Sequence, residues 1–197
     1  MKALRKIGLG LVIALVAAVV LSRAVPTGAQ EVTSQFRIQL SVINRLLVGL
    51  RTITANLDED YTQLFSMGTG ANQINAMWQS ERTLSANGTE TLDFSGSLTD
   101  DFGQSITCTK IKALVIKAAS GNTNNVLVGG ASTTITSLTS TGALTQGLVV
   151  RPGGLLLWTF PDSTGAAVTA GSADLLQVSN SSSGSSVTYD VIAVCVE

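Results

Sequence analysis

Residues suited to chemistry are few in this 197-residue chain. Histidine is absent, which removes the commonest general base and a common metal ligand at once. The sequence has no G-x-S-x-G motif, no P-loop and no dinucleotide-binding fingerprint. Because histidine is absent, a serine nucleophile would also lack its usual base. We expect no catalytic residue, no resident metal and no cofactor, and the sequence predicts that the protein is not an enzyme.

The two cysteines, Cys108 and Cys195, have no second cysteine or histidine at zinc-ligand spacing. Two interpretations stay open. In one, strands that are distant in the sequence lie side by side and the cysteines form a disulfide, which would stabilise the fold by roughly 3–5 kcal/mol in an oxidising compartment. In the other, both are small buried hydrophobic residues.

Carboxylates and aromatic residues offer two weaker possibilities. The clusters 58–60 and 100–101 could supply oxygen ligands for Ca²⁺, but neither has the spacing of a dedicated calcium loop. We expect solvated turns or helix ends there. A carboxylate pair for glycoside hydrolysis is a spatial requirement, and Trp78 and Trp158 alone give little basis for sugar subsites. Trp158 and Phe160 alternate along one predicted strand and are expected to pack in the core.

Composition restricts the partners. The net charge is −1 and only 13% of residues are charged, so no basic block is available to follow a phosphate backbone. Direct nucleic-acid binding is therefore not expected. Ser, Thr, Gly and Asn replace the missing charges, as in extracellular or virion β-proteins. Such a weakly charged surface loses little hydration energy when subunits pack together.

Residues 1–29 have the anatomy of a secretory signal. Lys2, Arg5 and Lys6 precede an apolar run over residues 7–21, and a short polar exit ends at Ala29. The run of about 15 residues is short for a membrane span of ~20. Cleavage, which predicts an exported protein, and retention as a hydrophobic helix that contacts a membrane or a shell both stay open.

Residues 30–65 form a second segment, for which we favour an amphipathic helix. Apolar residues recur there every three or four positions. The predicted assembly residues on this stripe are Val32, Phe36, Leu40, Ile43, Leu47 and Leu50. The competing interpretation is a strand, because Phe36, Ile38, Leu40 and Val42 alternate with polar residues. Asp58-Glu59-Asp60 would close the helix.

Residues 66–197 form the third segment, in which apolar residues recur at every second position from Arg82 onward. The run 106–116 is apolar on both faces in its second half, which is typical of a central strand. Further strands are predicted at 125–128, 133–138, 147–150, 155–160, 167–169, 175–179 and 187–196, with turn residues between them. Many short strands at regular spacing predict a mainly β fold, an antiparallel β-sandwich or jelly roll.

Several short pieces of this third segment resemble a family of tailed-phage virion proteins of the capsid-decoration kind. The pieces are GTGANQ (68–73), Trp78 with RTL (82–84), LTDDFG (98–103), ITCTKIKAL (106–114), GNTNN (121–125), VRPGG (150–154), AGSADLL (170–176) and SVTYD (186–190). The resemblance covers residues 68–197 and implies a β-sandwich in a virion shell or appendage. It carries no catalytic residues. The export-like segment and the two cysteines depart from the family pattern.

The resemblance leads to an expected function. We expect a structural virion protein, a capsid-decoration, minor capsid or appendage subunit that associates with copies of itself and with other virion proteins, at the virion or at an extracellular surface. Two alternatives remain: a secreted filament or surface-layer subunit, and a carbohydrate-binding β-sandwich module, which would need an exposed aromatic pair on one sheet face.

Overall fold

The structure is a computed structural model that describes residues 33–48, 51–131, 133–138 and 147–197. The fold is mainly β, as predicted, and no helix occurs among the described residues. Contacts divide the described chain into two units: residues 34–64 form the first, and residue 33 with residues 65–197 forms the second. The hydrophobic helix predicted near the N-terminus lies outside the described residues.

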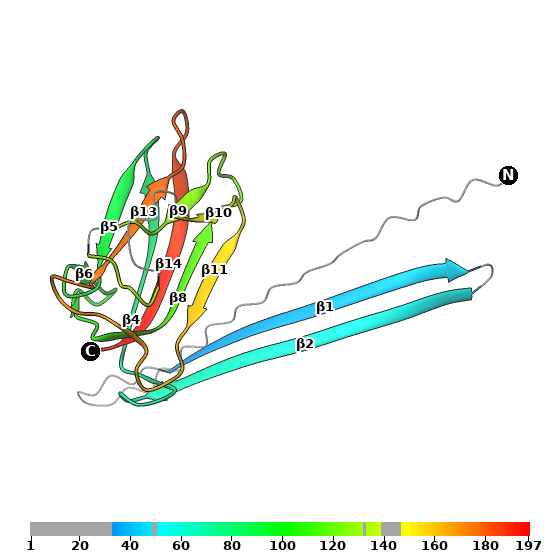
Figure 1. Ribbon diagram of the computed structural model, residues 1–197, viewed down its shortest axis with the longest axis horizontal. Coiled ribbons are helices and arrows are strands. Elements are labelled where there is room, and N and C mark those ends of the chain that lie inside the picture. Colours follow the sequence, from blue (N-terminus) through cyan, green and yellow to red (C-terminus); the bar gives the residue numbers. More distant parts are fainter. Residues whose placement is uncertain (1–32, 49–50, 132, 139–146) are drawn as a thin grey trace. The chain divides into compact units, whose positions relative to one another are not determined.

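The first unit corrects the prediction for residues 30–65. These residues form strand β1 (Ser34–Val48) and most of strand β2 (Arg51–Met67), and not an amphipathic helix. The two strands pair with each other, and we call this pair the hairpin (Figure 1). Asp58-Glu59-Asp60 lies inside β2 and ends no element. The alternation that favoured a strand at Phe36–Val42 was the better signal, and the β-branched residues of 52–54 extend it.

The predicted assembly stripe is wrong as a helical surface, because spacings of three, such as that from Leu40 to Ile43, fall on opposite faces of a strand. Phe36 is buried. Leu40, Ile43 and Leu47 belong to β1, but their side chains lie outside what the structure describes. Val32 and Leu50 lie outside the described residues altogether.

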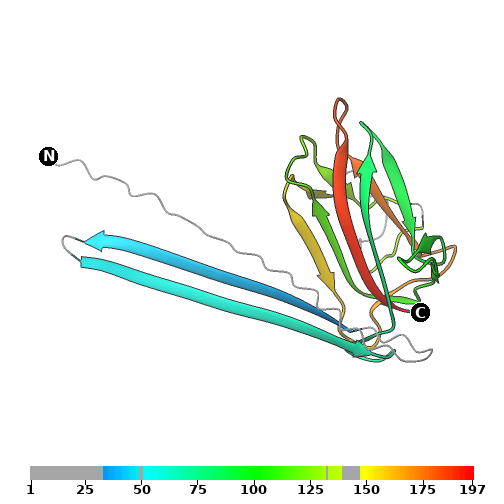
Figure 2. The same cartoon turned by 180° about the vertical axis from the view of Figure 1, so that it is seen from behind.

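The second unit contains two larger antiparallel sheets. The first has the order β10-β9-β13-β5, and the second has the order β11-β8-β14-β4, with β12 also pairing with β8 (Figures 1 and 2). Their strands are β4 (Ala76–Leu84), β5 (Thr89–Asp93), β8 (Lys110–Ala118), β9 (Val126–Val128), β10 (Leu148–Val150), β11 (Leu155–Thr159), β12 (Ala166–Ala167), β13 (Leu175–Asn180) and β14 (Val187–Val196). Shorter pairs involve β3 (Gln73–Ile74), β6 (Leu98–Thr99) and β7 (Ser105–Ile106).

Both sheets contribute to one hydrophobic core. Leu92, Val128 and Val178 come from the first sheet, and Leu114 and Val191 come from the second. The predicted central strand is confirmed, since β8 pairs with β14 on one side and with β11 on the other. Its apolar residues face the core on one side and cover the outer face of the sheet on the other, which explains why both faces read as apolar in the sequence.

Two segments differ from the predicted strands. Residues 133–138 make only an isolated bridge at Thr134, although Ile135 is buried in the core. The predicted long strand from Ile106 is split between β7 and β8, with Cys108 in the gap. Apolar alternation records burial, and a buried loop residue gives the same signal as a strand residue.

The chain passes from one sheet to the other between β10 and β11. This turn holds Arg151-Pro152-Gly153-Gly154, where Gly154 N donates to Arg151 O at 2.7 Å. Gly153 has φ +72°, a conformation that residues with a Cβ rarely adopt. The turn connects β10 to β11, and each of these strands lies at the edge of its sheet.

Candidate assembly surfaces

The hairpin has two unlike faces. Arg37 forms an ion pair with Asp60, and Asp58 accepts a hydrogen bond from Ser41 Oγ at 2.6 Å. These contacts put the odd-numbered residues of β1 and the even-numbered residues of β2 on one face, which we call the polar face. This face also carries Leu64, which is 60% exposed. By alternation, Leu57 and Tyr61 lie on the opposite face.

This opposite surface, which we call the apolar face, consists of Phe36, Ile38, Leu57 and Tyr61, with Glu59 between the last two. Phe36 is buried, but Leu57 and Tyr61 are 49% and 48% exposed. A two-stranded hairpin is marginally stable in water unless a further strand or another surface covers its apolar side. The exposed part of the apolar face therefore marks a surface where a partner would add stability.

Charged groups on the polar face are engaged with each other and with solvent. The Arg37 guanidinium lowers the pKa of the Asp60 carboxyl through a hydrogen bond, and Asp60 raises the pKa of Arg37 in the same way. Of the two clusters considered for calcium, Asp100 Oδ1 accepts the amides of Phe102 and Gln104, which is the geometry of a turn. Among the described residues, no group of three or more acidic or cysteine ligands could hold a metal ion.

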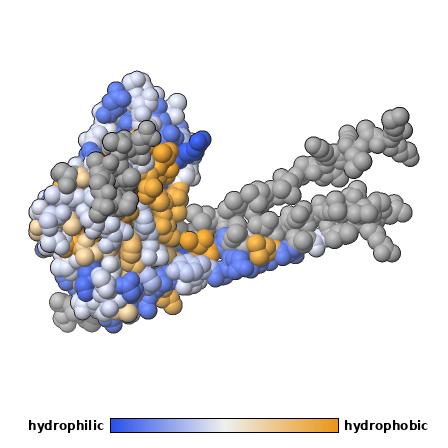
Figure 3. All heavy atoms as spheres, viewed as in Figure 1, coloured by the Kyte–Doolittle hydropathy of each residue, from blue (hydrophilic) through white to orange (hydrophobic). Residues whose placement is uncertain are grey.

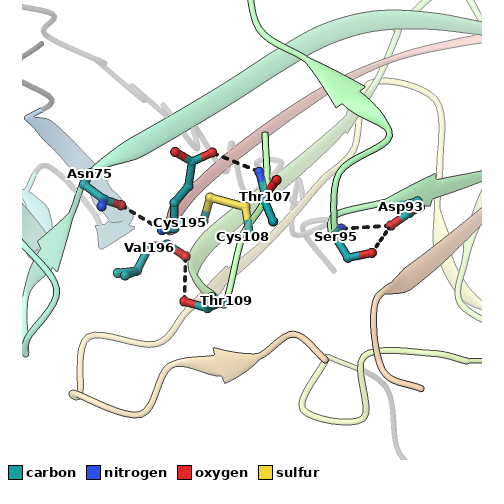
Figure 4. The surroundings of a disulfide bond; sticks show 9 residues. Asn75, Asp93, Ser95, Thr107, Cys108, Thr109, Cys195 and Val196 are labelled. Carbon is teal, nitrogen blue, oxygen red and sulfur yellow. Dashed lines mark hydrogen bonds between the residues drawn. A yellow bond between two sulfur atoms is a disulfide. The ribbon is translucent and has the colours of Figure 1, made fainter. Parts of the chain in front are cut away.

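The last strand is fixed by a covalent bond. Cys108 and Cys195 form a disulfide with a Cα–Cα distance of 5.7 Å, so the structure has the first of the two arrangements left open by the sequence (Figure 4). Both cysteines are buried. The residues that follow the two cysteines are also joined, because Thr109 N and Oγ1 donate to Val196 O at 2.7 and 3.0 Å. The disulfide lies where the pairing of β14 with β8 shifts between Val194 and Cys195.

Three titratable residues connect the two sheets on the side of β4 and β5. Arg82 on β4 forms an ion pair with Glu90 on β5, and Glu90 Oε1 accepts a hydrogen bond from the hydroxyl of Tyr189 on β14 at 2.7 Å. Burial raises the pKa of Tyr189, and the bond to Glu90 raises it further. The ion pair and the hydrogen bond thus join strands of both sheets. Sequence reasoning missed this link because it crosses between two sheets, and Tyr189 is 99 positions from Glu90.

A buried lysine is a second feature that the sequence did not reveal. Lys112 on β8 is fully buried, and its Nζ donates to the carbonyl of Asp162. Burial lowers the pKa of Lys112, although the nearby Asp162 carboxylate opposes that effect. Lys110 Nζ donates to Ser163 O at 3.0 Å. The two lysines thereby hold the turn that follows β11.

The two tryptophans differ in burial. Trp78 is buried, its ring packs edge-on against Phe94 with centroids 6.0 Å apart, and its Nε1 donates to Thr99 O. Trp158 is partly buried and packs against the core with Leu156 and Phe160. Trp158 and Phe160, predicted to pack in the core, are partly buried and pack against it. The described exposed aromatic residues, Tyr61 and Phe102, lie on the hairpin and in the β6–β7 turn.

No described helix is long and apolar enough to cross a membrane, and the apolar run 7–21 lies outside those residues. The chain matches no family model, no curated protein and no solved structure. Its likeness to the decoration proteins therefore depends on the short sequence pieces alone.

Proposed function

We propose that this chain is a non-enzymatic structural subunit of a virion, and that it works by associating with copies of itself and with other virion proteins through the hairpin. The observation that carries the proposal is the exposed part of the apolar face, Leu57 and Tyr61. A hairpin of this length has no core of its own, so its stability depends on what covers this face.

Burial of the apolar face supplies the driving force. Fully burying one large apolar side chain contributes about 1.5–3 kcal/mol. Association also costs several kcal/mol in lost freedom of motion, so a few such side chains in each copy must be buried together. The low overall charge of the chain keeps the accompanying loss of hydration small.

Assignment to a virion is supported by the resemblance of residues 68–197 to decoration proteins. The two antiparallel sheets around one core fit the β-sandwich which that resemblance implies. In this proposal the sandwich faces outward and the N-terminal segment faces the lattice or a membrane. The mechanism is adhesive and requires no chemistry.

A second candidate, a secreted filament or surface-layer subunit, is favoured by two observations. The Cys108–Cys195 disulfide is typical of proteins in oxidising compartments, and residues 1–29 resemble an export signal. The association physics is the same in both candidates. Mass spectrometry of purified particles and of secreted filaments from the source organism distinguishes the two locations.

The assembly proposal is tested with the full chain. Light scattering coupled to size-exclusion chromatography and electron microscopy should show defined oligomers of the wild type. Replacing Leu57 and Tyr61 together with lysine should dissociate them, because both charges would have to be buried in the interface. Asn56→Lys is the matched control, since Asn56 is an exposed neighbour on the opposite face of β2.

Two outcomes would overturn the proposal. One is a wild-type chain that stays monomeric at tens of micromolar, well above the range in which stable interfaces associate. The other is a Leu57→Lys/Tyr61→Lys variant that assembles as the wild type does. Dissociation by the Asn56→Lys control as well would show that added charge, and not the apolar face, is responsible.

A further inference from the structure

The edge strands on the two sides of the second unit differ in their charged residues. On one side, the edge strands β4 and β5 carry charged residues, among them Glu81, Arg82 and Glu90, and the Arg82–Glu90 ion pair links the two sheets. On the other side, the edge strands β10 and β11 carry no charged residue. Charges on an edge strand hinder its pairing with another chain, so only the second side is left open to pairing.

Strand β11 presents unpaired backbone groups on its outer edge. Phe160 N donates to Lys112 O, and Ala118 N donates to Gly154 O. Residues at even positions of this segment therefore direct their backbone toward β8, and Leu155, Leu157 and Thr159 direct theirs away from it. Among the described residues, nothing pairs with β11 on that outer edge.

The side chains of the same three residues lie on the outer face of the sheet. Their register partners on β8 are Lys117, Val115 and Ala113, whereas Leu156 and Trp158 pack against the core. On this face Leu157 lies beside Val115 of β8, which is buried, and Val115 lies beside Ile192 of β14. Figure 3 shows apolar residues gathered along the side of the unit that β11 forms.

We infer that β11 is a pairing site for β11 of a second copy, with the two strands antiparallel about a two-fold axis at Leu157. This inference rests on the proposed assembly function and names a second contact for it, separate from the hairpin. A two-fold contact brings identical surfaces together, which an uncharged strand tolerates. Leu157 would face its own equivalent, and Leu155 would face Thr159 of the other copy, each pair exchanging both backbone hydrogen bonds.

Charge at the two ends of the strand favours this orientation. Arg151 lies in the turn before β11 and Asp162 in the turn after it, and both are exposed. Antiparallel pairing brings the turn of Arg151 beside the turn of Asp162 of the other copy, at both ends of the contact. Parallel pairing would instead bring Arg151 beside Arg151. Among the described residues, Arg151 forms no ion pair within its own chain.

The first test is Leu157→Cys in the full chain under mild oxidation. If β11 pairs with itself, the thiols introduced at position 157 of two copies should form an intermolecular disulfide, seen as a dimer on a non-reducing gel and located by peptide mapping. The native cysteines are already bonded to each other and buried, so they provide no competing thiol. A chain that assembles but forms no such cross-link would overturn the inference.

The second test is Leu157→Lys, which places a charge opposite itself at the centre of the contact. It should weaken the association at this edge by about tenfold or more. Gln79→Lys is the matched control, because Gln79 is exposed on the outer face of the same sheet, on the opposite edge strand β4. Tryptophan fluorescence of both variants verifies that they fold. If Leu157→Lys does not fold, the Leu157→Cys cross-link still tests the contact.

The results separate the inference from the proposed function. Oligomers that respond to Leu57→Lys/Tyr61→Lys but not to either change at Leu157 would retain the hairpin contact and overturn the β11 contact. A cross-link in the Leu157→Cys variant together with no response to the hairpin variant would retain the β11 contact and overturn the hairpin's role. A wild-type chain that never self-associates would overturn both.

Discussion

The hairpin and the two-sheet unit differ in how far their large apolar side chains are buried. In residues 65–197, large side chains such as Phe94, Leu114 and Tyr189 are fully buried within the chain. In the hairpin, Leu57 and Tyr61 remain half exposed. The comparison teaches that residues 65–197 bury a core within one copy, whereas the hairpin leaves large apolar side chains exposed, which supports the proposal that a partner covers them.

Polar groups show the same contrast. In the two-sheet unit, polar side chains hold loops and sheets together: Asp174 accepts hydrogen bonds from Gly171 N, Ser95 Oγ and Thr133 Oγ1, and Asn180 Nδ2 donates to Ser85 O. In the hairpin, ionic contacts lie on an exposed face. Exposed pairs contribute little, whereas buried polar networks define one arrangement of the chain.

The largest expected effect concerns the disulfide of the complete unit. Replacing Cys108 and Cys195 together with alanine should lower the free energy of unfolding by about 4 kcal/mol, because the bond spans 87 residues and limits the unfolded chain. Denaturation followed by tryptophan fluorescence measures this directly, since both tryptophans lie in the two-sheet unit.

The same variant sharpens the comparison between the two regions. Below its denaturation midpoint it should still associate through the hairpin, whose residues are not constrained by the bond. An unchanged midpoint would show that the disulfide adds nothing to the unit. Loss of association in a folded variant would show that the two regions do not act separately.

The sequence predicted the two-sheet unit better than the hairpin. Period-two alternation identified β8, β11, β13 and β14 with small errors at their ends, because each strand has one face in the core. The pairing of Cys108 with Cys195 could not be derived, since it depends on which strands lie side by side. Alternation gives the strands and leaves their order open.

The hairpin was mispredicted for a physical reason. Its apolar residues between Leu40 and Leu50 are dense enough to fit a helical spacing as well as an alternating one. The local sequence there carried conflicting signals. The Arg82–Glu90–Tyr189 link was missed for a different reason. Its members pair across the two sheets, and their spacing in the sequence does not predict which strands of the two sheets lie side by side.

A smaller effect is expected from the link between the sheets. Tyr189→Phe removes a buried hydrogen bond to the Glu90 carboxylate and should cost about 2 kcal/mol at neutral pH. Denaturation by guanidinium chloride, followed by tryptophan fluorescence, gives the difference. Tyr61→Phe is the control, because Tyr61 is half exposed on the hairpin and should leave the midpoint unchanged.

Tyr189 also predicts how stability depends on pH. Its pKa in the folded chain is raised above the ordinary value of 10.0, so above about pH 10 the unfolded chain loses a proton that the folded chain keeps. Its contribution is therefore complete below pH 10 and declines above it, by about 1.4 kcal/mol per pH unit. The Tyr189→Phe variant should lack this decline. Parallel curves for the two proteins between pH 9 and 11 would contradict the assignment.

The smallest effects compare two ion pairs of the same chemistry in the two regions. Arg82→Gln should cost about 1 kcal/mol, since its partner Glu90 is largely buried although the guanidinium is partly exposed. Arg37→Gln breaks the exposed pair with Asp60 and should leave unfolding of the two-sheet unit unchanged. Because Arg37 lies on the polar face, the oligomers should also persist, as light scattering can show. Dissociation by Arg37→Gln would mean that partners bind the polar face, and the hairpin would then be completed from the side opposite to the one inferred from Leu57 and Tyr61.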